Sequence, residues 1–261
     1  MNRLLLSIII LLCSVSAIAQ NVSDYQTKAE QGDAAAQARL ALCYYFGNGV
    51  QKDYNKASKW FLKAAEQGNA EAQGYIGYCY AKGLGVKQDY AEAVKWLRKG
   101  AECGDTFSQE HLATRYEKGE GVATDYYEAV KWYRRAAEQG RANAQNSLGV
   151  CYQLGQGVEK NMIEALNWYR KAAEKGNDQA QRNVGSCYFN GNGVKQDYKE
   201  AVIWYRKAAE QGLATAQANL GYCYEKGLGV SKNIQEAKKW YQKAAEQGNQ
   251  DGIKRLAWLN K

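Results

Sequence analysis

A glycine recurs every 36 residues along most of this chain, and this fixed period constrains the fold more than any other feature. The positions are Gly32, Gly68, Gly104, Gly140, Gly176, Gly212 and Gly248. Because the interval never changes, six repeats without insertions occupy 33–68, 69–104, 105–140, 141–176, 177–212 and 213–248. Such a period is typical of proteins in which each repeat buries its apolar face against its neighbours.

Each repeat is predicted to contain two helices. Ala144, Leu148 and Tyr152 are spaced i, i+4, i+8, which indicates one face of a first helix. A Gly-x-Gly-Val segment then ends that helix, since glycine adopts positive φ without a steric cost. Ala165, Trp168 and Ala172 mark the buried face of a second helix. Helices of roughly 13 residues would be about 20 Å long and marginal alone, so stacking must stabilise them.

The second helix has its own start signal. Most repeats place Asp or Asn before it and glutamate three residues later, as in Asp89 and Glu92 or Asn161 and Glu164. This spacing predicts a capping box, in which each side chain bonds the backbone N–H of the other residue.

The fold class that follows is an all-α solenoid of six helix-turn-helix repeats. The chain contains no proline and 7 tryptophans, 20 tyrosines and 4 phenylalanines, which favours packed helices over disorder. Within segments 20–32 and 249–261, Tyr25 to Gly32 matches the closing half of a second helix and Gln250 to Leu259 the opening of a first helix. We interpret these two segments as N-terminal and C-terminal caps.

Residues 1–19 have the pattern of a signal peptide. Arg3 precedes an apolar run from Leu4 to Leu12, and Ala17-Ile18-Ala19 forms a small-x-small cleavage site. We therefore expect a mature start near Gln20, a periplasmic or secreted location, and no integral membrane segment after cleavage. A lipoprotein signal at Cys13 is disfavoured because the bulky Leu12 precedes it.

The repeat pattern A-x-A-Q-x-x-L-G-x-x-Y-x-x-G-x-G-V-x-x-D-Y-x-x-A-x-x-W-Y-x-K-A-A-E-Q-G closely resembles the Sel-one-like repeat family, a relative of the tetratricopeptide repeats. The resemblance covers 33–248 and implies a right-handed α/α superhelix with a concave surface, and a role as an adaptor in protein complexes. Some secreted bacterial members of a cysteine-rich branch are described as penicillin-binding or weakly β-lactam-hydrolysing. Those members carry paired cysteines in each repeat and this chain does not, which weakens that transfer.

The sequence offers no candidate catalytic residue, metal site or cofactor site, and we predict that the chain is not an enzyme. Its single histidine, His111, shares a repeat position with Tyr75 and Asn183, and we interpret it as a surface residue. A lone histidine lacks the partners of a metal cluster or a triad. No serine is followed three residues later by lysine, so the serine motif of penicillin-binding enzymes is absent.

Five cysteines share one repeat position: Cys43, Cys79, Cys151, Cys187 and Cys223. Equivalent positions in neighbouring repeats should lie about 8–10 Å apart, too far for a disulfide, so we predict buried free thiols and no disulfides. Arg115 replaces the cysteine in the third repeat and needs either solvent or an acidic partner. Cys103 lies at a helix end and is a thiol without a plausible partner.

The charge pattern argues against nucleic acid as a partner. The formal net charge is +8, but lysines and arginines alternate with acids in the second helices, which is typical of a solvated face. A weak preference for anionic envelope polymers remains open. Sequence-specific nucleic-acid binding is not expected of an exported protein.

A binding surface is predicted on the varying face of the first helices. Aromatic and arginine residues dominate binding hot spots, and the candidates here are Tyr45, Phe46, Tyr75, Tyr78, Arg115, Arg182, Phe189 and Tyr222. The leading hypothesis is a scaffold that binds a protein or peptide of the cell envelope through a concave helical surface. The alternatives are a binder of cell-wall glycan or muropeptide, a β-lactam-binding or weakly hydrolysing protein, and ordinary surface variation without a ligand.

Overall fold

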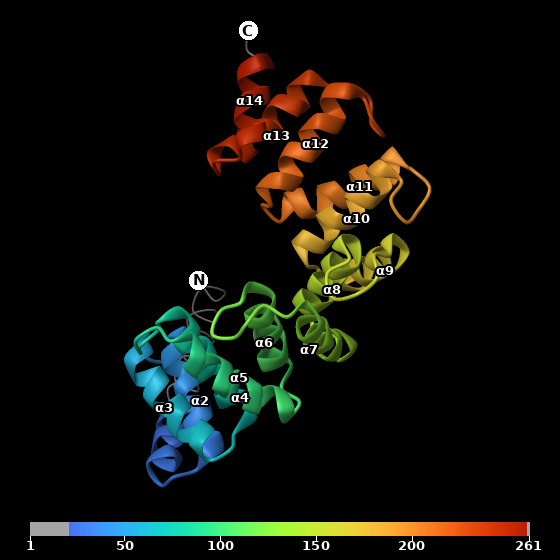
Figure 1. Cartoon of the computed structure of the whole chain (residues 1–261). Helices are drawn as coiled ribbons and strands as arrows, with labels where there is room; N and C mark the ends of the chain where they lie inside the picture. The colour runs from blue at the N-terminus through green and yellow to red at the C-terminus, as the bar shows by residue number, and fades with distance from the viewer. Residues whose placement is uncertain (1–20, 260–261) are drawn as a thin grey trace, which may run out of the picture. The chain divides into compact units, whose positions relative to one another are not determined.

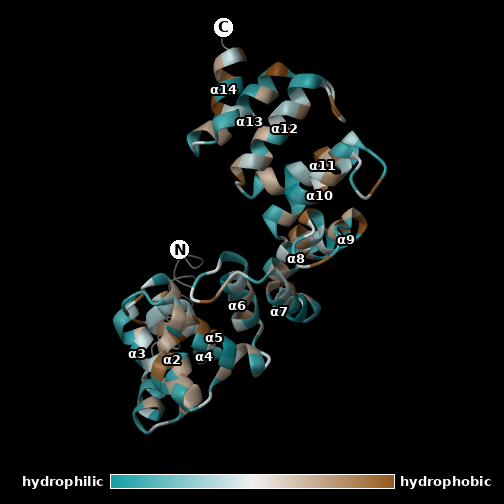
Figure 2. Cartoon of the chain, in the orientation of Figure 1, coloured by the Kyte–Doolittle hydropathy of each residue, from teal (hydrophilic) through white to brown (hydrophobic). Residues whose placement is uncertain are grey.

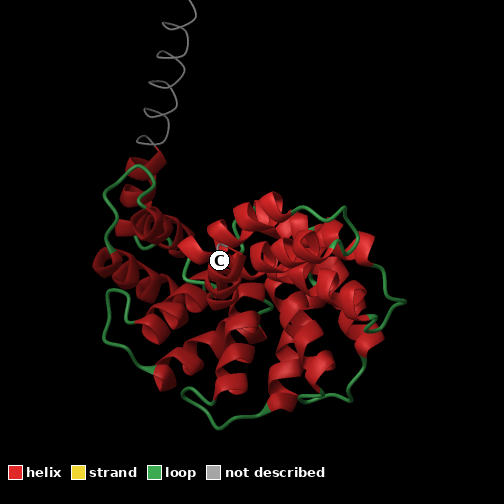
Figure 3. Ribbon diagram, turned by 90° about the horizontal axis from the view of Figure 1, so that it is seen from above, coloured by secondary structure: helices red, strands yellow, loops and turns green. Residues whose placement is uncertain are grey.

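The described residues, 21–259 of this computed structural model, are helices joined by turns, which confirms the all-α fold (Figures 1 and 3). Residues 21–30 are helical. The first helices of the repeats are α2 (Ala34–Phe46), α4 (Ala70–Lys82), α6 (Thr106–Lys118), α8 (Ala142–Leu154), α10 (Asp178–Asn190) and α12 (Ala214–Lys226). The second helices are α3 (Tyr54–Glu66), α5 (Tyr90–Glu102), α7 (Tyr126–Glu138), α9 (Met162–Glu174), α11 (Tyr198–Glu210) and α13 (Ile234–Glu246), and α14 (Gln250–Leu259) follows. The predicted signal peptide, 1–19, and Gln20 lie outside the described residues.

The chain divides into two compact units, 1–132 and 133–261, and the division falls within α7. Unit 1 contains helices α2 to α6 and unit 2 contains α8 to α14. In both units first helices pack on the second helix of their own repeat, as α4 does on α5 and α10 on α11. Second helices also pack on the following first helix, as α3 does on α4 and α11 on α12, so the repeats stack within a unit.

The glycine turns are needed for this packing. Gly47 ends α2 with φ of 79°, and its N–H donates to the carbonyl of Cys43. Gly85, in the turn after α4, has φ of 68°, and a Cβ atom there would lie 2.0 Å from the carbonyl oxygen of Tyr54. No other residue type fits so close to a neighbouring backbone, which explains why the second glycine of the turn recurs.

The second helices are capped, but not by the reciprocal capping box that the sequence predicted. The Asp89 carboxylate accepts from the N–H groups of Ala91 and Glu92, as an N-cap should. The Asp89 N–H instead donates to the carbonyl of Tyr80 at 2.9 Å. Glu92 bonds Lys95 at 3.0 Å. The glutamate therefore supports the helix surface, because the turn already satisfies the N–H that it would have capped.

Tryptophans and tyrosines of the second helices form much of the interior, whereas the predicted first-helix tyrosine, as at Tyr152, is mostly half-buried. Trp96, Trp132, Trp168 and Trp240 are buried, and the tyrosine positions of the second helices are fully buried at Tyr133, Tyr169 and Tyr241. Alanines pack around them, as Ala165 and Ala172 do beside Tyr169. A side chain of this size contributes about 1.5–3 kcal/mol when it leaves water. This burial in successive repeats holds the stack together.

Two polar contacts tie one repeat to the next. In the first, the glutamine of each first helix donates to an alanine carbonyl at the end of the preceding second helix, as Gln109 Nε2 does to Ala101 at 3.2 Å. In the second, an arginine of a second helix donates to the tyrosine hydroxyl of the next first helix, as Arg98 does to Tyr116 at 2.5 Å. These hydrogen bonds are buried or half-buried, so breaking them would leave polar groups unpaired. They therefore hold neighbouring repeats in a fixed register.

Apolar and polar residues alternate around the helices (Figure 2). Within the described residues, no helix combines the length and the hydrophobicity required to span a bilayer.

Candidate binding surface on the first helices

The structure brings together the four aromatic residues predicted in unit 1. Tyr45 and Phe46 lie on α2, and Tyr75 and Tyr78 lie on α4. Two further residues of α6 complete the group, which we call the aromatic cluster: Tyr45, Phe46, Tyr75, Tyr78, Phe107 and His111. The cluster thus runs over the first helices of three consecutive repeats.

Tyr75 is the centre of the aromatic cluster. Its ring stacks on Phe107 with centroids 4.8 Å apart and on Phe61 of α3 with centroids 5.0 Å apart. The ring of Tyr45 meets it edge-on at 5.6 Å. Offset and edge-to-face pairs at these separations each add about 0.5–1.5 kcal/mol beyond area burial, so the cluster is a rigid surface. Phe46 at its margin has an exposed fraction of 54%.

His111 belongs to the aromatic cluster and is not the unconstrained surface residue that the sequence suggested. Its ring lies 4.2 Å from that of Phe107 and 4.8 Å from that of Tyr78, and the residue is half-buried. The residue type varies widely at this position, from Arg39 and Tyr75 to Ser147 and Asn219, and gave no sign of a contact; only in this repeat does the preceding turn carry an aromatic residue, Phe107.

Arg115 lies away from the exposed face. Its side chain is 7% exposed and forms an ion pair with Glu120, in the turn after α6. Its guanidinium also lies 5.4 Å from the ring centre of Tyr90. Of the two expectations for this residue, solvent or an acidic partner, the structure has the acidic partner. Arg115 therefore stabilises the third repeat and is not available as a ligand contact.

The three candidates in unit 2 line a single pocket of about 290 Å³. Arg182 and Phe189 lie on α10, and Tyr222 lies on α12. We call this the α10–α12 pocket; its other lining residues are Ser186, Asn190, Tyr205 and Asn219. Arg182, Ser186, Phe189 and Asn190 are spaced i, i+4, i+7, i+8, which places them on one side of α10.

Tyr205 forms the floor of the α10–α12 pocket. Its side chain is 3% exposed, and its hydroxyl donates to Ser186 Oγ at 3.2 Å. Burial raises the pKa of Tyr205 to about 12, although the Ser186 hydrogen bond and the charge of Arg182 act in the opposite direction. The hydroxyl is therefore a neutral donor at physiological pH.

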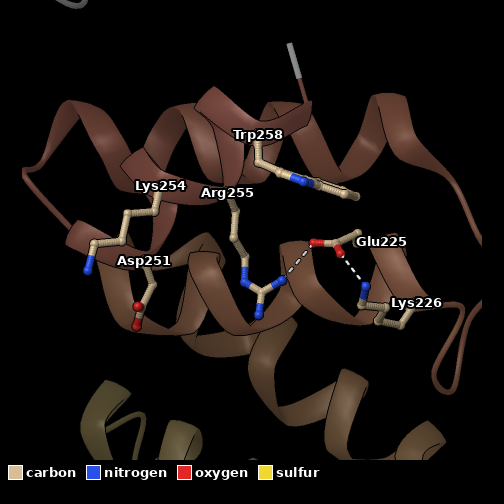
Figure 4. Close-up of a pocket in the computed structure, with 6 residues that line it drawn as sticks. All are labelled: Glu225, Lys226, Asp251, Lys254, Arg255 and Trp258. Atoms are coloured by element: carbon tan, nitrogen blue, oxygen red, sulfur yellow. Dashed lines mark hydrogen bonds and ion pairs between the residues drawn. The ribbon is translucent and has the colours of Figure 1, made fainter. Parts of the chain in front are cut away.

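A second pocket of unit 2, of about 310 Å³, lies between α12 and α14 (Figure 4). Glu225 at its base is 3% exposed and pairs with Lys226 at 2.6 Å and Arg255 at 3.0 Å. Burial favours a higher pKa for Glu225, but hydrogen bonds from Lys226 and Tyr241 and the charge of Arg255 outweigh it and lower the pKa. The charge of Glu225 is thus compensated within the pocket, and Trp258 beside it is 64% exposed.

The shared cysteine position is mostly buried, as predicted. Cys79, Cys151, Cys187 and Cys223 are buried free thiols, and Cys43 is half-buried. Burial raises the pKa of Cys79 and of Cys223 to about 12 and that of Cys187 to about 11. Cys103 is exposed. The buried thiols therefore behave as small apolar side chains.

Sequence reasoning missed Phe107 and His111 in unit 1, and Ser186, Asn190, Tyr205 and Asn219 in unit 2. Phe107 carries a usable signal, since it precedes His111 by four residues and therefore shares its helix face. The polar residues of the α10–α12 pocket carry none, because such types are ordinary on any helix surface. Across 21–259, no group of three or more His, Cys, Asp or Glu side chains is placed to hold a metal ion.

Comparison with known families matches the Sel1 repeat six times, at 34–69, 70–105, 106–140, 142–177, 178–213 and 214–249. The chain belongs to the Sel1 repeat family. This match confirms the resemblance and the repeat fold, and Sel1 repeat solenoids are scaffolds that typically mediate protein–protein interaction.

Solved structures of Sel1 repeat proteins agree. A Sel1 repeat protein from Oxalobacter formigenes is 37% identical with a TM-score of 0.80, and the match covers 90% of this chain and 94% of that one. The protective antigen c5321 of uropathogenic Escherichia coli strains is 38% identical with a TM-score of 0.72. That match covers 91% of this chain but only 59% of c5321, so the chain spans less than two thirds of that protein.

More distant similarity concerns the fold alone. Yeast Tom70 has 14% identity and a TM-score of 0.52, over 95% of this chain and 59% of Tom70. The comparison with curated proteins finds no match.

Proposed function

We propose that this chain is an exported scaffold that binds a protein or peptide of the cell envelope through its first helices. The aromatic cluster is the observation that carries the proposal. Its six ring-bearing side chains lie on the first helices α2, α4 and α6, and Tyr75 and Tyr78 among them are half-buried. Rigid aromatic surface of this kind loses little conformational entropy when a partner covers it.

A peptide fits the aromatic cluster better than a glycan does. Sugars bind aromatic residues by lying on a ring face. Tyr75 already has two rings stacked on it, Phe61 and Phe107, so a sugar cannot lie on its ring faces. Edges and gaps between rings are suited to apolar side chains, which fill them in the way that hot-spot residues fill pockets.

The test is retention of partners by matched variants. The purified chain is immobilised, incubated with envelope extract of the producing cell, and crosslinked. Tyr75→Ala/Tyr78→Ala should lower the recovered partner by about tenfold or more, because truncation of one hot-spot residue costs at least about 2 kcal/mol. Lys59→Ala/Lys95→Ala changes two exposed residues of the second helices and should leave recovery unchanged. Equal recovery with both variants, or retention on purified peptidoglycan instead of protein, contradicts the proposal.

Export is supported by the apolar run and the Ala17-Ile18-Ala19 site. The expected product is a mature chain that starts near Gln20 and lies in the periplasm or medium. Fractionation followed by N-terminal sequencing tests it. Recovery of a cytoplasmic chain that retains Met1 or Asn2 at its start contradicts this part of the proposal.

A further inference from the structure

The α10–α12 pocket contains a positive charge without a counter-ion. Arg182 Nη1 donates to Asn183 Oδ1 at 2.6 Å, and Arg182 Nε is buried without a hydrogen-bond partner. None of the ion pairs formed within residues 21–259 includes Arg182. A half-buried guanidinium that lacks an acidic partner is costly for the fold, and such groups are candidates for ligand recognition.

Other arginines of the same unit are satisfied. Arg170 and Arg206 donate to the hydroxyl groups of Tyr188 and Tyr224 at 2.6 and 2.7 Å. Arg255 pairs with Glu225 at 3.0 Å (Figure 4) and lies over the ring of Tyr222. The repeat framework thus supplies partners where arginine has a structural role. The other repeats have Ala38, Gly74, Glu110, Asn146 and Ala218 at the position of Arg182, so the framework does not require an arginine there.

The remaining lining residues determine which anion fits. Ser186, Asn190, Asn219 and the Tyr205 hydroxyl are neutral polar groups, and the pocket contains no acidic residue. One cation among neutral donors matches one negative charge, whereas a phosphate group carries about −1.5 to −2. A guanidinium binds a planar carboxylate with two parallel hydrogen bonds. The pocket is therefore built for a carboxylate.

The aromatic lining determines what the carboxylate is attached to. Phe189 and Tyr222 face the pocket with ring centroids 6.2 Å apart, and Phe189 also contacts Tyr205. These rings give one side of the pocket an apolar surface. The volume of about 290 Å³ lies at the lower end of the range of roughly 300–1,000 Å³ for ligand sites. It accommodates one residue of a longer ligand.

We propose that the α10–α12 pocket binds a carboxylate of a peptide, held by Arg182, while an adjacent apolar or aromatic side chain packs on Phe189 and Tyr222. The choice of a peptide rests on the proposed function. The carboxylate is either the chain terminus or an aspartate or glutamate side chain, and the two sources share the same chemistry. The pocket is then a specificity site of the scaffold in unit 2.

The experiment uses four small probes and the resonance of the Arg182 Nε–H group in the ¹⁵N-labelled chain. N-acetyl-phenylalanine presents a terminal carboxylate, and its amide does not. The blocked dipeptide N-acetyl-Phe-Asp-amide presents a side-chain carboxylate, and N-acetyl-Phe-Asn-amide is its neutral match. We expect at least one acid to shift the Arg182 Nε–H resonance and to bind about tenfold or more tightly than its amide, since a hydrogen bond to a charged group contributes about 1.5–3 kcal/mol. Whichever acid binds more tightly identifies the source.

Matched variants complete the test. Arg182→Gln should abolish the preference for acid over amide, and Arg182→Lys should retain only part of it because lysine lacks the planar fork. Arg206→Gln removes an equal charge outside the pocket and should leave the preference unchanged. Equal affinity for acid and amide, no shift at Arg182 in the unmodified chain, or tighter binding of glucuronic acid than of either peptide acid overturns the proposal. None of these results depends on the aromatic cluster, so they are distinguishable from failure of the proposed function.

Discussion

Removal of the charge on Glu120 should destabilise the third repeat by about 2 kcal/mol. Arg115, 7% exposed, occupies a position held by cysteine in the other repeats, and Glu120 is its counter-ion. Loss of one partner of a fully buried pair costs about 3–5 kcal/mol, because the remaining charge is left without compensation. The Glu120 side chain is 29% exposed, so water can partly compensate the charge of Arg115 after the substitution. The expected loss of about 2 kcal/mol is therefore smaller than that for a fully buried pair.

The double variant provides the decisive comparison. Arg115→Cys/Glu120→Asn restores the residue types that the first repeat has at Cys43 and Asn48. Replacement of a whole buried pair is often neutral, so we expect this variant to remain within about 1 kcal/mol of the unmodified chain. Glu120→Gln alone should lower the urea midpoint by about 1 M, given a slope of about 2 kcal/mol per M. Tryptophan fluorescence in a urea series measures both.

Additivity would refute this reasoning. If Arg115→Cys and Glu120→Asn have separate effects whose sum equals that of the double variant, the two charges do not interact in the folded state. An effect of Glu120→Gln below about 0.5 kcal/mol would lead to the same conclusion, since that is the range of ordinary surface substitutions.

Three further predictions use contacts elsewhere in the chain. Tyr116→Phe removes the hydroxyl that accepts from Arg98 and should lower the free energy of unfolding by about 1 kcal/mol. Tyr80→Phe is the control and should lower it very little, because the preceding repeat has Leu62 at the position of Arg98. Equal losses in urea unfolding would contradict this. Native thiol labelling should show one fast-reacting group, absent in Cys103→Ser, because Cys103 is exposed and the neutral buried thiols react slowly. Stability should fall as pH rises above about 8.5, by up to about 1.4 kcal/mol per pH unit for each thiol, because the unfolded chain ionises its cysteines while Cys79 and Cys223 keep a pKa of about 12 and Cys187 one of about 11. Urea midpoints at pH 8 and 10 measure this loss of stability. If the triple variant Cys79→Ala/Cys187→Ala/Cys223→Ala lost as much stability between pH 8 and 10 as the unmodified chain, these thiols would not be its cause.

The repeats made the fold predictable, because six copies separate framework positions from variable ones. The glutamine position makes the same hydrogen bond in every copy, and the tryptophan position is buried in four copies and half-buried at Trp60 and Trp204. The capping box failed for a different reason. The Asp89 N–H donates to the carbonyl of Tyr80 and therefore does not need the Glu92 side chain as an acceptor. That bond depends on how the turn between the two helices folds, which the spacing of Asp89 and Glu92 does not show.

The candidate surface was predictable only in part. Variable aromatic residues such as Tyr45 and Tyr75 could be selected from the sequence because aromatic residues are enriched at binding hot spots, and the structure brings them together. Residues that depend on a partner do not. Arg115 carried the same signal as Arg182, yet one is paired with Glu120 and the other has no counter-ion among the described residues. Only the side chains around each guanidinium distinguish a structural arginine from a candidate ligand contact.

Site-specific photocrosslinking in the producing cell tests most directly whether partners bind the first helices. A photoreactive phenylalanine analogue replaces Tyr78 of α4 in one chain and Lys95 of α5 in another. We expect a discrete protein adduct from position 78 and none from position 95. An adduct from position 95 alone would place the partner on the second helices and rule out binding through the first helices.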